Sequence, residues 1–154
     1  MIAVSSCLLG EDCRYSGNNN YDRRITELLE DEEVISICPE VLGGLSTPRP
    51  PAEIQGGDGK GVLEGIARVI DKEGNDVTVS FIEGARESLA LIKEHGCSLA
   101  ILKAKSPSCG SRVIYDGSFS GNKKAGVGVT TALLQKEGIE VFNEEEIDRI
   151  ITKL

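Results

Sequence analysis

Four short apolar runs recur along the chain, each bounded by polar residues or by turn-forming residues. Runs of about four apolar residues are typical of strands that are buried on both faces, as in a parallel sheet. The runs that predict such strands occupy residues 2–4, 34–37, 99–102 and 139–142.

Stretches with apolar residues at helical spacing lie between or after these runs. The spacing predicts helices over residues 21–31, 83–94 and 129–137, and Asn143 with Glu146 is typical of a helix start before residue 147. The alternating order of strands and helices predicts the α/β class: a single domain with a mainly parallel sheet and helices on both faces.

Three segments depart from this alternation. Residues 43–61 are rich in glycine and proline, which predicts a long loop, and long ordered loops are usually functional. Residues 67–71 and 77–79 flank a turn-forming stretch and predict a hairpin. Residues 112–128 form another glycine-rich segment, which favours a short hairpin over the site in the position of a lid.

Composition narrows the classes of partner. The 154 residues suit one domain, and 25 acidic against 17 basic residues give a net charge of -8, which disfavours strong binding to nucleic-acid phosphates. An aromatic content of 4% with no Trp argues against a stacking platform for single strands. No stretch predicts a membrane span, and the amino terminus lacks a secretory signal pattern, so we expect a cytoplasmic protein.

Cys7, Cys38 and Cys109 each follow one of the predicted strands. The carboxyl ends of parallel strands meet at one edge of the sheet, where ligands bind in such folds. Thiolates are soft ligands for zinc, copper(I) or iron–sulfur clusters, and three protein ligands leave one position open, as at catalytic metals. The alternative is that these are ordinary buried cysteines.

The other two cysteines carry weaker signals. Cys13 lies close enough to Cys7 to reach the same edge, as a fourth ligand, as a thiol beside the ligands or as a plain loop residue. Cys97 precedes its strand, which predicts a structural position at the opposite edge. His95 is the only histidine, and it lies at the end of the helix predicted over residues 83–94. This position is at the opposite edge of the sheet, so His95 is a poor candidate for a catalytic base.

With His95 set aside, proton transfer falls to a carboxylate. Glu40 lies two residues after Cys38, beside an apolar stretch that would raise its pKa and suit it to carry a proton near neutral pH. Ser106 and Ser108 could donate hydrogen bonds to a substrate or a thiolate, although serine beside proline is also common in turns. The cations in the same loops, which could bind a polar or anionic ligand or simply lie at the surface, are Arg14, Arg49 and Lys105.

Several of these segments together form a recognisable set of motifs. The motifs are Cys7-Leu-Leu-Gly, Cys13-Arg-Tyr-Ser-Gly, Cys38-Pro-Glu-Val-Leu-Gly-Gly-Leu, Pro48-Arg-Pro-Pro-Ala-Glu and Ser106-Pro-Ser-Cys-Gly. In this order, over nearly the whole chain, the sequence resembles the thiouracil desulfidase family. The resemblance implies a Rossmann-like domain with a four-iron four-sulfur cluster on Cys7, Cys38 and Cys109, and a catalytic pair formed by Glu40 and Ser106.

The activity that the resemblance implies is a non-redox desulfidation. A small thiolated base such as 4-thiouracil, or a thionucleoside, would bind the unique iron through its sulfur and would be converted to uracil and hydrosulfide. Glu40 would carry a proton for the attacking water or the ring nitrogen, and Ser106 would help to orient the group that Glu40 serves.

Two other functions stay open at this point. One is a non-catalytic iron–sulfur or zinc protein, which would bind metal without any turnover that depends on Glu40. The other is sulfur transfer to an acceptor, which should need an activating nucleotide, and the sequence has no Walker-type loop to bind one.

Overall fold

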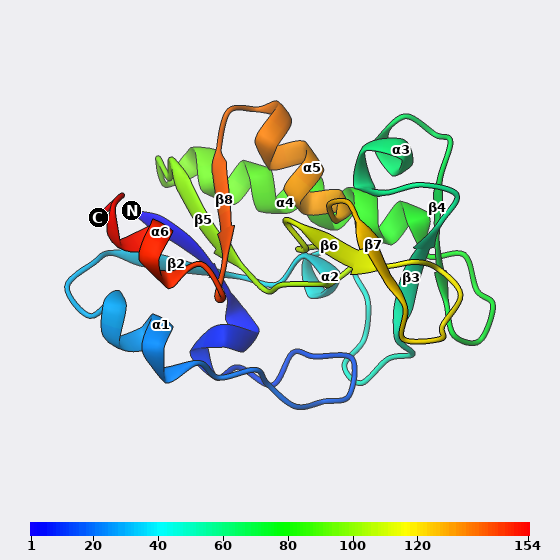
Figure 1. Cartoon of the computed structure of the whole chain (residues 1–154), viewed down its shortest axis with the longest axis horizontal. Coiled ribbons are helices and arrows are strands. Elements are labelled where there is room, and N and C mark those ends of the chain that lie inside the picture. The colour runs from blue at the N-terminus through cyan, green and yellow to red at the C-terminus, as the bar shows by residue number, and fades with distance from the viewer.

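The computed structural model describes all residues, 1–154, and its centre is a four-stranded parallel sheet (Figure 1). The strand order is β2-β1-β5-β8, and every neighbouring pair is parallel. The bounds are β1 Ile2–Ser5, β2 Val34–Ile37, β5 Leu99–Leu102 and β8 Glu140–Asn143. These strands confirm the four apolar runs to within one residue at each end.

Alternate residues of the strands point to opposite faces of the sheet, and helices cover both faces (Figure 1). Ile2 and Val4 pack in one core with residues of the segment around α1 (Arg23–Leu28) and of α6 (Ile147–Ile151). Ala3 belongs to the other core, with residues of α4 (Thr78–Glu94) and α5 (Val129–Lys136). The predicted fold class is therefore confirmed.

Two antiparallel pairs lie outside the main sheet. The strand β3 (Ala52–Gln55) pairs with β4 (Arg68–Asp71), and β6 (Val113–Tyr115) pairs with β7 (Lys123–Ala125). The second pair confirms the short hairpin predicted within residues 112–128.

The predicted hairpin between residues 67–71 and 77–79 is present only as a tight turn, with an isolated antiparallel bridge between Ile70 and Asp76 and a hydrogen bond from the Val77 amide to the Val69 carbonyl at 2.9 Å. The partner of β4 is β3, which lies in the segment predicted as a loop, and that segment also contains α3 (Gly59–Leu63). Residues 78 and 79 instead begin α4, and the Asp76 carboxylate accepts a hydrogen bond from the Thr78 amide just ahead of the first helical turn. The Thr78 hydroxyl also accepts from the Val69 amide at 2.9 Å, which fixes this helix start against β4.

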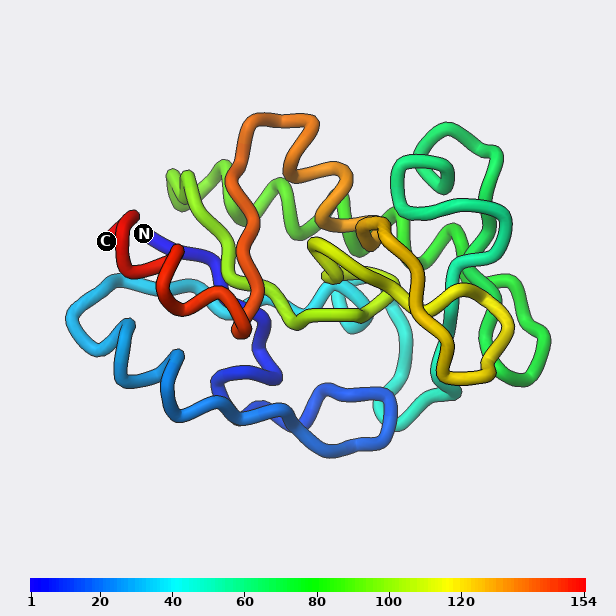
Figure 2. The backbone as a smooth tube through the Cα atoms, in the orientation of Figure 1, coloured from blue at the N-terminus to red at the C-terminus, as the bar shows by residue number.

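Both termini lie at the amino edge of the main sheet (Figure 2). The carboxyl edge faces β3, β6 and the loops that follow the strands (Figure 1). None of the helices combines the length and the apolarity needed to cross a bilayer.

The short helix α2 (Pro39–Leu42) crosses α4 with backbone against backbone. A Cβ added to Gly84 would overlap the carbonyl oxygen of Pro39, and one added to Gly43 would overlap that of Ser80. Since α2 begins directly after Cys38, this contact sets where Cys38 and the helix that carries Glu40 lie.

We expect Gly84→Ala to lower the free energy of unfolding by about 1–3 kcal/mol, because the methyl group must push α2 away from α4. Denaturant unfolding measures this change. Glu83→Ala is the matched control, since Glu83 is exposed on the same helix and should change stability by no more than about 0.5 kcal/mol. A Gly84→Ala protein as stable as the wild type would show that the two helices can separate freely.

Candidate active site

A cavity of about 520 Å³ opens at the carboxyl edge of the main sheet. Its lining includes Cys7, Cys38 and Cys109, so the structure brings together the three cysteines singled out from the sequence. Cys13 lines the same cavity, whereas Cys97 is buried at the start of β5, and all five cysteines are free thiols. The cavity therefore holds four thiols on segments far apart in sequence.

Two of these thiols are held by turns that end strands of the main sheet. Cys7 lies in the 3-10 turn Ser6–Leu9 directly after β1, and the turn ends at Gly10, whose φ of 96° is in the region that favours glycine. Cys38 follows β2 and is the N-cap of α2, with Pro39 at the first helical position.

Cys109 lies in a tighter turn after β5. Its amide donates to the Ser106 hydroxyl at 2.7 Å, and its carbonyl accepts from the Thr131 hydroxyl at 2.8 Å. A Cβ on Gly128 would overlap the Ser108 carbonyl, so this glycine lets the start of α5 press against the turn. The turn is thus fixed from both sides.

The thiols influence one another. Hydrogen bonding with Cys13 lowers the pKa of Cys7 to about 7 against the effect of burial, and the Asn20 amide also donates to the Cys7 sulfur at 3.5 Å. Hydrogen bonding with Cys13 likewise lowers the pKa of Cys38. Burial raises the pKa of Cys109. Two of the thiols therefore favour the thiolate, which is the form that binds metal.

Glu40 lines the cavity with a side chain that is 17% exposed. Its Oε2 accepts from the Arg49 guanidinium at 3.2 Å, while the buried Oε1 has no hydrogen-bond partner. Burial raises the pKa of this carboxyl, and Arg49 partly opposes that effect. A buried oxygen without a partner is uncommon in proteins and marks a position where a ligand or a proton can be bound.

The hydroxyl groups of the two serines differ in their surroundings. Ser106 lines the cavity, and its hydroxyl accepts from the amides of Ser108 and Cys109, so it shapes the turn. Ser108 is not among the lining residues, and its hydroxyl pairs with that of Thr130 at 2.8 Å. Ser108 also lies close to Glu40 and Cys109, and its contact with a substrate stays a prediction.

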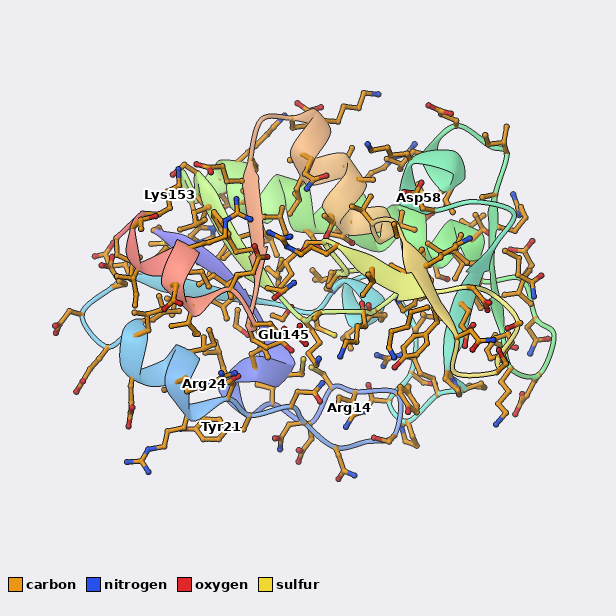
Figure 3. All side chains as sticks on the ribbon, viewed as in Figure 1. Arg14, Tyr21, Arg24, Asp58, Glu145 and Lys153 are labelled. Atoms are coloured by element: carbon orange, nitrogen blue, oxygen red, sulfur yellow. The ribbon has the colours of Figure 1, made fainter.

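The three predicted cations all line the cavity, but they differ in what they already bind. Arg49 is 9% exposed and donates to Glu40 and to the Cys13 carbonyl, so it holds the site together. Arg14 lies on the loop ahead of α1, with its guanidinium 5.4 Å from the centre of the Tyr15 ring (Figure 3). Lys105 forms an ion pair with Glu145 at the surface. Arg14 and Lys105 are thus the cations that a ligand can reach.

The sequence reasoning missed a further cation in the cavity. Lys103 lies directly after β5, and its ammonium contacts the Glu144 carboxylate at 2.7 Å. The other oxygen of Glu144 accepts from the Ala104 amide at 2.8 Å. Because Lys103 and Glu144 directly follow two adjacent parallel strands, the topology that grouped the cysteines could also have predicted this pair.

No three His, Cys, Asp or Glu side chains are arranged to bind a single metal ion. The fit to a cofactor is therefore judged from the donor atoms. The cavity offers sulfur donors on several segments, and thiolates are the usual ligands of iron–sulfur clusters. This donor set suits such a cluster.

Fold and site define an α/β protein with a thiol-lined cavity and a buried carboxyl group at the carboxyl edge of its sheet. Residues 2–146 match the family model described as 2-thiouracil desulfurase, and the chain belongs to this family. The resemblance drawn from the motifs is therefore confirmed.

Two similar proteins cover nearly the whole chain. The uncharacterized protein YbbK of Bacillus subtilis (strain 168) is 50% identical over 151 residues, which are 98% of this chain and 100% of that protein. The solved structure of the [4Fe-4S]-dependent thiouracil desulfidase TudS is 41% identical, with a TM-score of 0.84, over 99% of this chain and 98% of the other. The TM-score to TudS also confirms the predicted α/β fold.

Proposed function

We propose that this protein is an iron–sulfur-dependent desulfidase that converts a small thiolated pyrimidine, such as 4-thiouracil, into uracil and hydrosulfide. The net reaction replaces the carbon–sulfur bond with a carbon–oxygen bond from water and changes no oxidation state. The observation that supports it best is the cavity, which joins four thiols to the partnerless Oε1 of Glu40. The 41% identity to TudS supports the same activity.

The proposed cluster ligands are Cys7, Cys38 and Cys109, which line the cavity from three separate segments. When bound, a cluster with one iron free of protein ligands supplies a Lewis acid that polarises the bond between carbon and sulfur. Cys13 hydrogen-bonds with Cys7 and Cys38 and is proposed to lie beside the ligands rather than among them.

Glu40 is the proposed proton carrier. Arg49 holds Oε2 in place, so Oε1 is the atom available to a water molecule or to the ring nitrogen of the substrate. General acid–base catalysis needs a group within hydrogen-bonding reach of the proton that moves, with a pKa shifted towards neutrality. The raised pKa of Glu40 agrees with that requirement.

Ser106 is proposed to orient the substrate as the second member of the catalytic pair. Its hydroxyl oxygen already accepts two amide hydrogens, which leaves the hydroxyl hydrogen free to be donated into the cavity.

The substrate is proposed to be a small molecule. A cavity of about 520 Å³ falls within the range of small-molecule sites, roughly 300–1,000 Å³. Arg14 and Lys105 could meet the phosphate of a nucleotide, while the net charge of -8 disfavours a folded nucleic acid.

The test is anaerobic reconstitution with iron and sulfide, followed by incubation with 4-thiouracil in isotopically labelled water. We expect uracil and hydrosulfide in equal amounts and one labelled oxygen in the uracil. Zinc-loaded protein is the control and should be inactive. Cluster formation without turnover would favour the non-catalytic alternative, and sulfur release only with a nucleotide and an acceptor would favour sulfur transfer.

A further inference from the structure

Aromatic side chains are concentrated in the cavity. The chain has only three Phe, three Tyr and no Trp. Four of these six side chains line the cavity, namely Tyr15, Phe81, Tyr115 and Phe119. In a chain with so few aromatic residues, this grouping points to a planar ligand.

Phe119 differs from the other three in its surroundings. The Arg14 guanidinium lies over the Tyr15 ring at 5.4 Å, and the Lys123 ammonium lies over the Tyr115 ring at 5.5 Å. Phe81 is 3% exposed and belongs to a hydrophobic core. Phe119 has no cation over its ring and is only half-buried, so it is the candidate among the four for contact with a ligand.

The backbone at Phe119 is held in an unusual conformation. Its φ is 56°, in the left-handed region that residues other than glycine seldom adopt. The Glu53 Oε1 accepts from the Phe119 amide at 3.2 Å and from the Gly117 amide at 2.9 Å. The Gln55 side chain donates to the Gly117 carbonyl at 3.0 Å. The strand β3 therefore fixes the turn between β6 and β7 that carries Phe119.

The same hairpin is also joined to the turn that carries the reactive groups. An isolated parallel bridge links Ile114 of β6 to Lys105, which directly precedes Ser106. Lys105 also has a positive φ, of 72°. Both strained residues line the cavity, and such conformations persist only where the surrounding structure holds them. The hairpin that carries Phe119 is thus joined to the segment that leads into the Cys109 turn.

We propose that Phe119 is a substrate-binding residue that stacks on the flat face of the thiolated heterocycle. Glu53 is the positioning residue that holds Phe119 in this conformation. The inference rests on the proposed function for the identity of the heterocycle. It gives a role to the end of the Pro48-Arg-Pro-Pro-Ala-Glu motif, which the proposed chemistry leaves without one. Every nucleobase presents a π-face, so stacking suits a thiopyrimidine whatever its ring substituents.

The first test separates binding from chemistry in the reconstituted protein. Phe119→Leu keeps an apolar side chain but removes the π-face, and we expect the KM for 4-thiouracil to rise about tenfold, equivalent to about 1.4 kcal/mol. The kcat and the visible spectrum of the cluster should change less than about twofold, because the substitution leaves the thiols and Glu40 unchanged. Phe119→Tyr should restore the wild-type KM.

The role of Glu53 is tested with two variants. Glu53→Ala should raise the KM as Phe119→Leu does, because it frees the amides of Gly117 and Phe119. Glu53→Gln should restore it, since the amide oxygen can accept the same two hydrogen bonds. Equal loss in both variants would overturn the positioning role.

A binding measurement distinguishes this inference from the activity itself. Because the chain has no Trp, Phe119→Trp introduces a single indole, whose fluorescence should be quenched by uracil. Tyr21→Trp is the control, since Tyr21 is 55% exposed and does not line the cavity, and it should not respond.

The outcomes are separable. Quenching in Phe119→Trp alone, in a protein that does not desulfidate 4-thiouracil, would refute the proposed function and keep the aromatic site. Wild-type turnover with an unchanged KM in Phe119→Leu and no quenching in Phe119→Trp would overturn the stacking role and keep the function.

Discussion

Cys109→Ser is expected to abolish both cluster binding and turnover while the protein stays folded. Cys109 is proposed as one of only three ligands, and its turn is held in place by the hydroxyls of Ser106 and Thr131. A serine hydroxyl is a poor ligand for iron in such clusters, where thiolates are the rule. Iron and sulfide content, the visible spectrum after anaerobic reconstitution and uracil release measure the effect.

The chain offers a matched control for this substitution. Cys97→Ser makes the same exchange at a residue that is also buried, 7% exposed against 4% for Cys109, but precedes β5 at its opposite end. We expect this variant to keep its cluster and its turnover. A Cys109→Ser protein that binds a full cluster would contradict the proposed ligand set and would direct attention to Cys13.

Glu40→Gln is expected to lower turnover by a factor of about 10² to 10⁴, the usual contribution of a general acid–base group. The amide keeps nearly the same shape and can still accept a hydrogen bond from Arg49, but it cannot carry a proton. Cluster content should therefore be retained while kcat falls. Single-turnover measurements with 4-thiouracil would place the loss in the chemical step.

Glu27→Gln provides the comparison, because Glu27 is exposed on α1 and pairs only with Arg23. Its turnover should equal that of the wild type. If Glu40→Gln kept more than about a tenth of the wild-type kcat, proton transfer would have to be assigned to another group.

The main sheet and the grouping of the thiols were predictable because both follow from short-range patterns. The run Leu99–Leu102 is buried on both faces, and its uniform apolarity distinguishes it from an amphipathic segment. Once the strands are parallel, the residues after Ser5 and Ile37 must meet at one edge. Cys7 and Cys38 could therefore be placed together without knowledge of any side-chain contact.

The parts that could not be predicted depend on long-range pairing. Ala52–Gln55 is preceded by prolines and followed by glycines, so its local sequence resembles a loop, and only its ladder with Arg68–Asp71 makes it a strand. The direction of the Ser108 side chain depends on its hydrogen bond with Thr130. Thr130 belongs to α5 and lies 22 residues further along the chain. Neither feature leaves a periodic signal in its own segment.

The two antiparallel pairs have a consequence for how substrate preference can change within the family. Both pairs lie in the connections between strands of the main sheet: β3 and β4 between β2 and β5, and β6 and β7 between β5 and β8. Changes confined to the two pairs themselves alter neither the strands of the main sheet nor the residues that carry the thiols. Replacing these two pairs with those of a homologue is therefore expected to change the choice of substrate while the cysteines stay in place.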